Sequence, residues 1–247
     1  MHTVLAQIEQ RAHRAADHPF LRWLTDPNTP ARARIASWFA AAAPFVFGFK
    51  DLNAEVLPYP ADETDDPLKA AINHHLAEDA MHWPWYLHDL EKLGLDAPMP
   101  RSQHLRQLYG DDTVEQRRAV YRLCALAQRA ATPALRYCLV MALEAVAHRL
   151  FAALLALGTE LEHELDCELL YLGPRHFARE PGHLTHQTDE ADELFRCLRL
   201  DPATCREALA IADAVVDVIE ERWHAFLRLA QRSQPDGTSH ALTRSER

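Results

Sequence analysis

Apolar residues recur every three to four positions along most of the chain, which is the spacing of one face of an α-helix. Alternating runs of β-branched residues, which would indicate strands, are almost absent. The pattern therefore predicts an all-α protein. Long helices are expected near residues 3–16, 30–56, 66–93, 114–131, 133–157 and 202–232. Shorter helical pieces are expected near residues 102–109, 160–172, 174–181 and 187–198.

Capping residues and glycines predict where several of these helices begin and end. Thr113 and Gln116 have the spacing of a capping box, and Thr132 stands as an N-cap directly before Pro133. Glycine readily adopts the backbone conformation that ends a helix, so three glycines predict helix ends. These are Gly94, Gly110 and Gly158.

The segment 133–157 is apolar nearly all round and is therefore expected to form a central, buried helix. The chain shows no internal repeat and no linker that would divide it. Residues 1–232 are therefore predicted to form a single-domain helical bundle. The polar residues 233–247 lack bulky side chains and are expected to form a flexible C-terminal tail.

Composition and charge narrow the classes of function. The 247 residues carry a formal net charge of −10 without a Lys/Arg cluster, which argues against binding to nucleic acid or to an anionic membrane. The longest apolar stretch, near Ala40–Phe49, is too short to span a membrane, and no secretory signal is recognised. Five scattered cysteines without a CxxC pair predict a reduced, cytoplasmic protein. The unusual feature is the count of 15 histidines, because histidine is the commonest metal ligand.

Glu78 and His82 are the first candidate ligands. They lie four residues apart, so they would project from one face of the helix expected over 66–93 and could bind one metal ion. His88 is the alternative histidine, because Pro84 can change the winding of the helix before it. A solvated helix face is the ordinary alternative for such a pair.

Glu144 is the second candidate, because it stands in the middle of the apolar segment 133–157. A buried carboxylate needs a cation or a strong hydrogen-bond donor. A metal ion would satisfy it, and so would an ion pair with Arg136 or Arg149, which are close in sequence.

The third candidate is an H-x3-E-x2-H run formed by His176, Glu180 and His183. On a regular helix the three side chains would fall within an arc of roughly 60° and could bind a metal together. Pro181 and Gly182 interrupt the run and disfavour a regular helix as far as His183. The three candidates together supply three carboxylates and three histidines, which is the inventory of a two-metal carboxylate site in a helical bundle.

Other histidines near these residues are given lesser roles. His74 and His75 lie close to the face of Glu78, where they could support the site or rival its ligands, although surface positions are expected for both. His148 follows Glu144 by four residues and is expected to support the site or to fill the core.

In the order and spacing of these motifs, the chain resembles the haem-oxygenase-like di-iron oxidases, a helical family related in fold to haem oxygenase and to the TenA and PqqC proteins. The resemblance covers residues 66–230, and the 32 residues from Glu144 to His176 fit the family pattern. It implies a single-domain helical bundle of the haem-oxygenase-like type. The implied metal ligands are Glu78, His82, Glu144, His176, Glu180 and His183, with His88 as the alternative to His82.

The resemblance also implies an activity. Members of this family bind two Fe(II) ions and use O2 as co-substrate to oxidise a small organic molecule, and carboxylate and imidazole ligands would also suit manganese. The implied substrate is an amino acid, an amine or a fatty acid, and the outcome is N-oxygenation, desaturation or C–C cleavage. An external electron donor and a homodimer are both compatible with it. Aromatic residues in Trp38–Phe49, together with Trp83, Trp85 and Tyr86, are candidates for the walls of the substrate pocket.

Two other functions remain open from the sequence. A TenA-like hydrolase would share the fold and act without metal through a cysteine nucleophile, for which Cys138 is the only candidate. A non-catalytic helical protein that binds a ligand or haem is the second, in which one histidine would bind the haem iron.

Overall fold

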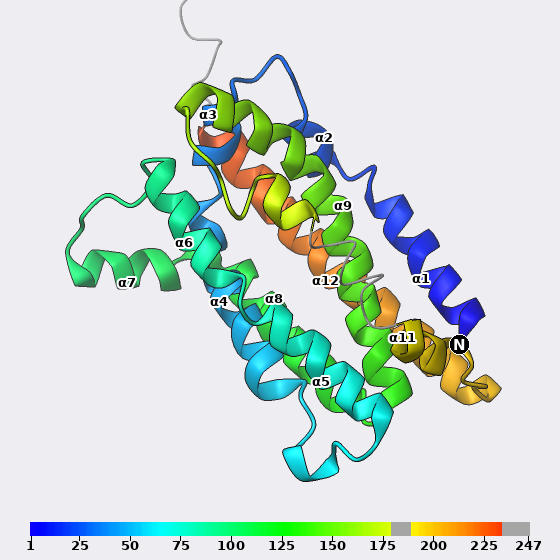
Figure 1. Cartoon of the computed structure of the whole chain (residues 1–247). Helices are drawn as coiled ribbons and strands as arrows, with labels where there is room; N and C mark the ends of the chain where they lie inside the picture. Colours follow the sequence, from blue (N-terminus) through cyan, green and yellow to red (C-terminus); the bar gives the residue numbers. More distant parts are fainter. Residues whose placement is uncertain (179–188, 234–247) are drawn as a thin grey trace, which may run out of the picture.

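The computed structural model describes residues 1–178 and 189–233, and in these residues the fold is all-α without a strand (Figure 1). The longer helices are α1 (His2–Ala15), α2 (Pro19–Leu24), α3 (Ala31–Ala36), α4 (Ala43–Asp51), α5 (Pro67–Asp79), α6 (Trp83–Lys92), α7 (Arg101–Tyr109), α8 (Val114–Arg129), α9 (Pro133–Leu165), α11 (Asp189–Arg196) and α12 (Pro202–Ser233). Short 3-10 turns cover Ala40–Ala42, Ala61–Glu63 and Asp111–Thr113, and a π-helical turn covers Leu52–Val56. The all-α prediction is confirmed.

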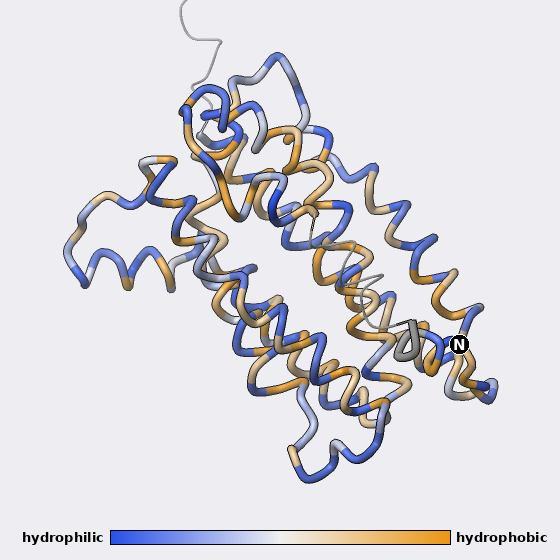
Figure 2. The backbone as a smooth tube through the Cα atoms, viewed as in Figure 1, coloured by the Kyte–Doolittle hydropathy of each residue, from blue (hydrophilic) through white to orange (hydrophobic). Residues whose placement is uncertain are grey.

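Helices α9 and α12 pack against each other along the centre of the molecule (Figure 1). Helix α1 contacts both of them on one side, and α8 contacts α12 on the other. Helix α4 packs on α8, whereas α5 contacts α9 directly. The pattern of α1 explains its place, because Val4, Ile8 and Ala12 recur every four residues and are all buried. In Figure 2 apolar positions gather on the inward faces of the helices, while the outward faces are mainly hydrophilic. The central position expected for the segment 133–157 is confirmed.

The helix expected over 66–93 is interrupted between Asp79 and Trp83. Helix α5 ends at Asp79, and α6 begins at Trp83 with Pro84 in its first turn. Proline lacks the N–H that a helix interior requires, whereas a first turn leaves that position unbonded. His82 is the N-cap residue of α6, so its side chain does not follow the face of α5 on which Glu78 lies.

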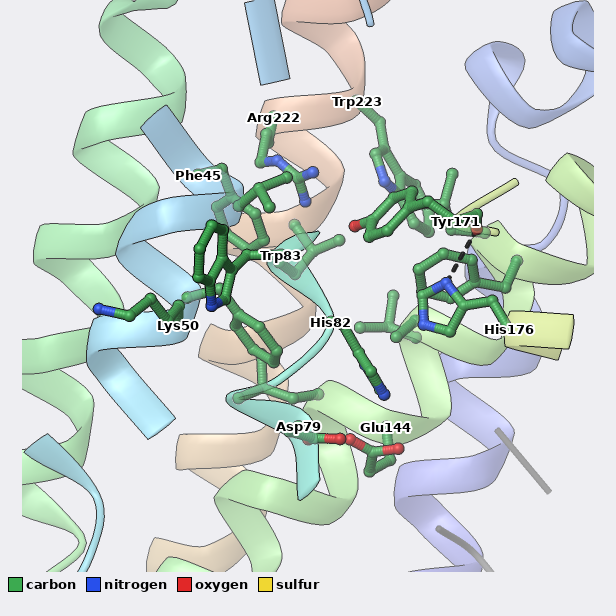
Figure 3. Close-up of a pocket in the computed structure, with 18 residues that line it drawn as sticks. Phe45, Lys50, Asp79, His82, Trp83, Glu144, Tyr171, His176, Arg222 and Trp223 are labelled. Atoms are coloured by element: carbon green, nitrogen blue, oxygen red, sulfur yellow. Dashed lines mark hydrogen bonds between the residues drawn. The ribbon is translucent and has the colours of Figure 1, made fainter. Parts of the chain in front are cut away.

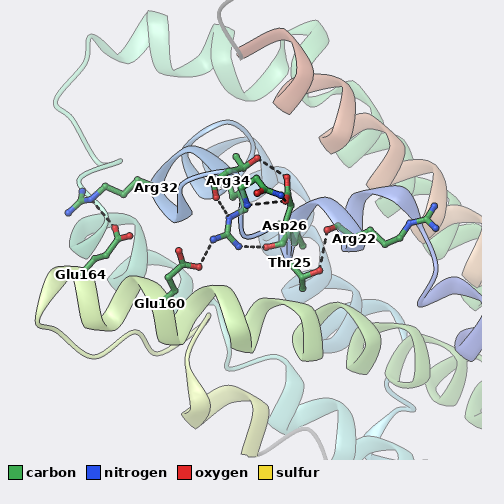
Figure 4. Close-up of polar contacts among 10 residues, drawn as sticks. Arg22, Thr25, Asp26, Arg32, Arg34, Glu160 and Glu164 are labelled. Atoms are coloured by element: carbon green, nitrogen blue, oxygen red, sulfur yellow. Dashed lines mark hydrogen bonds and ion pairs between the residues drawn. The ribbon is translucent and has the colours of Figure 1, made fainter. Parts of the chain in front are cut away.

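The expected helix over 30–56 is also divided, because α3 ends at Ala36 and α4 begins at Ala43 with Pro44 in its first turn. A buried arginine fixes this region to α9 (Figure 4). Arg34 is only 2% exposed, donates hydrogen bonds of 2.7 Å to the carbonyl oxygens of Leu24 and Thr29, and forms an ion pair with Glu160. Its charge is therefore compensated where it is buried.

The caps expected at two helix starts have different outcomes. Thr132 accepts a hydrogen bond of 3.3 Å from the amide of Leu135, so the N-cap of α9 is confirmed. The capping box of Thr113 with Gln116 is wrong. The Thr113 hydroxyl instead donates to the carbonyl oxygen of Leu108 at 2.7 Å, and Gln116 is buried against Arg222.

Helix α9 runs past Gly158 to Leu165, so the predicted end at Gly158 and the separate helix over 160–172 are wrong. Gly158 serves close packing instead. An added Cβ would lie 2.2 Å from the carbonyl oxygen of Leu172 and 2.7 Å from its carbonyl carbon. The segment 166–173, which is largely irregular, therefore packs directly on the backbone of α9. The glycines at 94 and 110 do follow helix ends, since α6 ends at Lys92 and α7 at Tyr109.

Replacing Gly158 by alanine is expected to destabilise the protein by about 2 to 3 kcal/mol, because the new methyl group meets backbone atoms that cannot turn away. Urea unfolding of the two proteins measures the difference. The exposed neighbour Thr159 provides a control, since Thr159→Ala should change the free energy of unfolding by about 0.5 kcal/mol at most. Equal stability of Gly158→Ala and the wild type would contradict the close packing.

Two segments, Ala31–Val56 and Pro133–Leu165, are long and apolar enough to cross a membrane by length and composition alone. Charged residues divide both segments into shorter apolar runs, as Lys50 does in the first and Glu144 in the second. In Pro133–Leu165, 67% of the most apolar window is buried inside the molecule. The test is weak evidence for a membrane span, because the core helix of a soluble protein also passes it.

Candidate metal centre

Two carboxylates and one histidine meet in the core between α5 and α9. His75 and Asp79 come from α5, Glu144 comes from α9, and their side chains are 1%, 6% and 6% exposed. The Nε2 atom of His75 lies 3.5 Å from Oδ2 of Asp79 and 3.4 Å from Oε1 of Glu144. Atoms that share one ion at about 2.1 Å lie roughly 3 to 3.5 Å from each other. The group therefore has the spacing and the donor types of a metal site.

The buried face of α5 explains why Asp79 reaches this group and Glu78 does not. The buried residues of this helix are Ile72, His75, Leu76 and Asp79, at the i, i+3, i+4, i+7 spacing of one helix face. Glu78 lies off that face and is exposed. The structure thus brings Asp79 rather than the expected Glu78 next to Glu144. The surface position expected for His75 is wrong, because its side chain belongs to the buried face.

Glu144 is buried, as expected, and its partner in this group is His75. Neither arginine considered as its alternative partner approaches it. Arg136 donates to the carbonyl oxygen of Leu57 at 2.7 Å and lies over the ring of Tyr59, and Arg149 forms an ion pair with Glu9. Among the described residues, the imidazole of His75 is therefore the group that faces both buried carboxylates, Asp79 and Glu144.

The two carboxylates control the charge of His75. Burial lowers the pKa of this imidazole, but the hydrogen bond to Glu144 and the charge of Asp79 outweigh burial and raise its pKa to about 9. Without a metal ion, His75 is therefore protonated at neutral pH, and among the described residues it places a positive charge beside Asp79 and Glu144. A divalent ion would take over that role and would displace the proton.

The metal-free protein is expected to lose stability as the pH rises from 6.5 through 9. The folded pKa of His75 lies above its ordinary value, so the stabilisation is fully present below pH 6.5 and is lost as the pH passes the folded value of about 9. Urea unfolding of metal-free wild type and His75→Gln across this range measures it. The difference in free energy between them should shrink with rising pH, and a constant difference would contradict the assigned pairing.

His82 lies at the pocket side of the carboxylates, at the break between α5 and α6. Figure 3 shows its ring directed towards Glu144, with His176 to one side of it. The ring of His82 lies 4.6 Å from that of His176 and stacks on Trp85 at 5.0 Å, measured between centroids. His88, the alternative ligand, points elsewhere, because its Nδ1 lies 3.1 Å from a carboxylate oxygen of Asp89.

The two histidines can be separated by mutation. His82→Ala is expected to lower the affinity for Fe(II) at least about tenfold, because it removes an imidazole adjacent to Glu144. His88→Ala should leave the affinity within about twofold, since its ring contacts Asp89 outside the carboxylate group. Anaerobic Fe(II) titration of the three proteins measures both effects. A larger loss in His88→Ala would place the second histidine, rather than the first, at the metal.

His176 reaches the same pocket from the other side and is 1% exposed. Its Nδ1 lies 2.9 Å from the carbonyl oxygen of Tyr171. A carbonyl oxygen only accepts, so Nδ1 carries the proton, and in the neutral ring Nε2 has the lone pair that a metal would bind. Phe151 packs on the ring at 4.0 Å and holds its orientation. Glu180 and His183, the other members of this motif, lie outside the described residues.

Asp89 holds the segment that carries Tyr171 and His176, and sequence reasoning missed it. Its side chain is fully buried, and its carboxylate accepts hydrogen bonds from three consecutive backbone amides at 2.7 to 2.9 Å. The donors are the amides of Leu170, Tyr171 and Leu172. Glu162 accepts a further bond of 2.8 Å from the amide of Leu169. This irregular segment is thus fixed by the buried carboxylate of Asp89 and the half-buried carboxylate of Glu162.

A mainly apolar pocket opens beside the carboxylates (Figure 3). Its cavity volume is about 70 Å³, and the pocket is partly open to solvent. Of the aromatic residues expected in its walls, Phe45, Phe49 and Trp83 line it. Trp38 and Tyr86 are buried in the core instead. Val146, Leu150, Phe151 and Ile219 complete the apolar surface.

His148 lies one turn after Glu144 on α9 and is half-buried. Its ring stacks on Phe177 at 5.3 Å, so within the described residues it packs on the helical turn that carries His176. This contact is a packing contact, which is one of the two roles expected for His148.

Cys138, the candidate nucleophile of a metal-free hydrolase, is unsuited to that role. Its side chain is fully buried, its Sγ lies 3.6 Å from the sulfur of Met1, and it does not line the pocket. Burial raises the pKa of the thiol to about 12, so the reactive thiolate is scarce at neutral pH.

Comparison with models of known protein families finds no match, and comparison with curated proteins finds none either.

Proposed function

We propose that this protein is a non-haem di-iron oxidase that binds iron around Asp79 and Glu144 and uses O2 to oxidise a small organic substrate in the adjacent pocket. The observation that carries the proposal is the buried group of His75, Asp79 and Glu144. His82 and His176 lie in the wall of the adjacent apolar pocket together with the two carboxylates. This set of oxygen and nitrogen donors suits iron or manganese. A structural zinc site would favour cysteine ligands.

Each residue has a separate task in this proposal. Asp79 and Glu144 would bind the cations, because buried carboxylates favour a nearby positive charge. His82 and His176 would bind from the pocket side, and the hydrogen bond from His176 Nδ1 to the carbonyl oxygen of Tyr171 puts the lone pair of the neutral ring on Nε2. His75 would be a further nitrogen ligand on the side of the carboxylates that faces the core. Bound iron would supply the activation of O2, and an external donor would supply any further electrons.

The apolar walls have their own role. Phe45, Phe151 and Ile219 exclude water from the space next to the carboxylates. Exclusion of water strengthens electrostatic interactions there and protects a reactive site from side reactions. The substrate would enter this space and be held with one carbon or nitrogen atom towards His82 and His176.

Anaerobic reconstitution with Fe(II) tests the proposal. The protein should take up about two irons per chain, as expected for a carboxylate-rich site in a helical bundle. Oxygen consumption should then rise in the presence of a substrate from a panel of amino acids, amines and carboxylic acids. Uptake of only traces of iron or manganese would refute the proposal.

The rival functions are tested on the same sample. A metal-free hydrolase would act on its substrate in the presence of a chelator and would lose activity in Cys138→Ser. A haem-binding protein would develop a Soret band on titration with haem. The position of Cys138 disfavours the first.

A further inference from the structure

Arg222 on α12 lies in the wall of the pocket and is 6% exposed. Figure 3 shows Arg222 and Trp223 at one end of the pocket and Asp79 and Glu144 at the other. Its guanidinium lies over the ring of Phe45, 3.5 Å from the centroid, and 5.2 Å from that of Phe226. A cation is thus buried against aromatic rings and faces a cavity.

The only hydrogen bond of this guanidinium within the described residues joins Nε to the side-chain oxygen of Gln116 at 2.7 Å. No carboxylate of the described residues forms an ion pair with it. By contrast, the charge of the buried guanidinium of Arg34 is compensated by an ion pair with Glu160 and by hydrogen bonds to two backbone carbonyl oxygens. Burying an unpaired cation is costly, so its retention in a pocket points to a ligand that supplies the anion.

Gln116 fixes how Arg222 is presented. By accepting from Nε, it leaves the two terminal nitrogens, which form the fork that binds carboxylates, for the pocket. Burial lowers the pKa of Arg222 to about 10, which still leaves it charged at neutral pH. Lys50, the other cation of the pocket wall, is already paired with Asp51 at 2.9 Å. A single positive charge matches a carboxylate better than a phosphate, which carries more charge.

We propose that Arg222, positioned by Gln116, binds the carboxylate of a substrate whose remaining part is apolar and extends along the pocket towards Asp79 and Glu144. The anion site is inferred from the surroundings of Arg222 alone. The role of Arg222 in orienting a substrate rests on the proposed oxidase function. In this arrangement the carboxylate is held away from the metal ligands. Oxidation would therefore occur at the end of the substrate distal to its carboxylate.

Binding to the metal-free protein tests the site without any reaction. The probes are octanoate with 1-octanol, and 3-phenylpropanoate with 3-phenyl-1-propanol, each pair differing in the anionic group. Binding is followed by calorimetry and by the fluorescence of the tryptophans that line the pocket. We expect at least one acid to bind at least about tenfold more tightly than its alcohol, as a charge-assisted hydrogen bond to Arg222 would give.

Three variants separate a binding role from a structural one. Arg222→Met should remove the preference for acid over alcohol, and Arg222→Lys should keep part of it, because the charge remains but the fork is lost. Lys50→Met is the matched control and should leave the preference within about twofold. A purely structural Arg222 would change stability in thermal unfolding without changing the preference. Equal preference in the wild type and Arg222→Met, or none in the wild type, would overturn the proposal.

Iron uptake of the same proteins keeps the two proposals distinct. Arg222→Met should take up as much iron as the wild type, because Arg222 lies at the other end of the pocket from the carboxylates. A wild type that prefers the acid but takes up no iron would refute the oxidase and retain the carboxylate site. A wild type that takes up iron but shows no preference for the acid would refute the carboxylate site and retain the oxidase.

Discussion

Replacing Asp79 by asparagine is expected to lower the affinity for Fe(II) by at least about a hundredfold, whereas replacing its neighbour Glu78 by glutamine should leave the affinity unchanged. The two substitutions each remove one carboxylate charge from the end of α5. Only Asp79 lies on the buried face with His75 and within reach of Glu144. An asparagine there cannot balance a divalent ion and offers a neutral oxygen in place of a charged one, so the loss should exceed that of removing a supporting residue.

Anaerobic Fe(II) titration with a colorimetric assay of bound metal measures both affinities. Glu78→Gln is the matched control, because its side chain is exposed and adjacent in sequence. Thermal unfolding of the metal-free variants shows that each is folded. If Glu78→Gln loses iron while Asp79→Asn keeps it, Glu78 rather than Asp79 is the ligand from α5, as the sequence alone predicts.

The position of Asp79 could have been predicted from the sequence. Ile72, His75 and Leu76 define an inward face at helical spacing, and Asp79 continues it while Glu78 does not. The motif order favoured Glu78 because a glutamate and a histidine four apart form a familiar pair. Periodicity of the surrounding apolar residues was the better guide to the face that reaches Glu144.

Contacts made by irregular backbone leave no comparable signal. Nothing in the pattern marks Asp89 as the acceptor for amides about 80 residues later, since the segment 166–173 has no periodicity. Gly158 is similar, because a glycine required by the close approach of Leu172 is indistinguishable in sequence from one that ends a helix. Gln116 fitted a capping box locally, and its true partner, Arg222, is 106 residues away. Helix content and the central helix were predictable because they depend on local pattern.

The second large effect is expected at Asp89, which lies outside the pocket. Replacing it by alanine should destabilise the protein by about 3 to 5 kcal/mol, because three amides that donate to its carboxylate lose their acceptor in a largely buried place. Asp89→Asn should be destabilised less, since the amide oxygen can accept some of these bonds while the NH2 group faces the remaining donor.

Loss of the carboxylate should also reach the metal site. Asp89 fixes Tyr171, whose carbonyl oxygen orients His176, so Asp89→Ala should weaken Fe(II) binding as well as stability. In Asp89→Ala, hydrogen exchange at the amides of residues 170–172 should be accelerated relative to the wild type. The acceleration should be larger there than for the amides in the middle of α9. Asp96→Asn, an exposed acidic residue just after α6, is the control and should change neither quantity. If Asp89→Ala were destabilised but bound iron as tightly as the wild type, the segment would stabilise the fold without positioning His176.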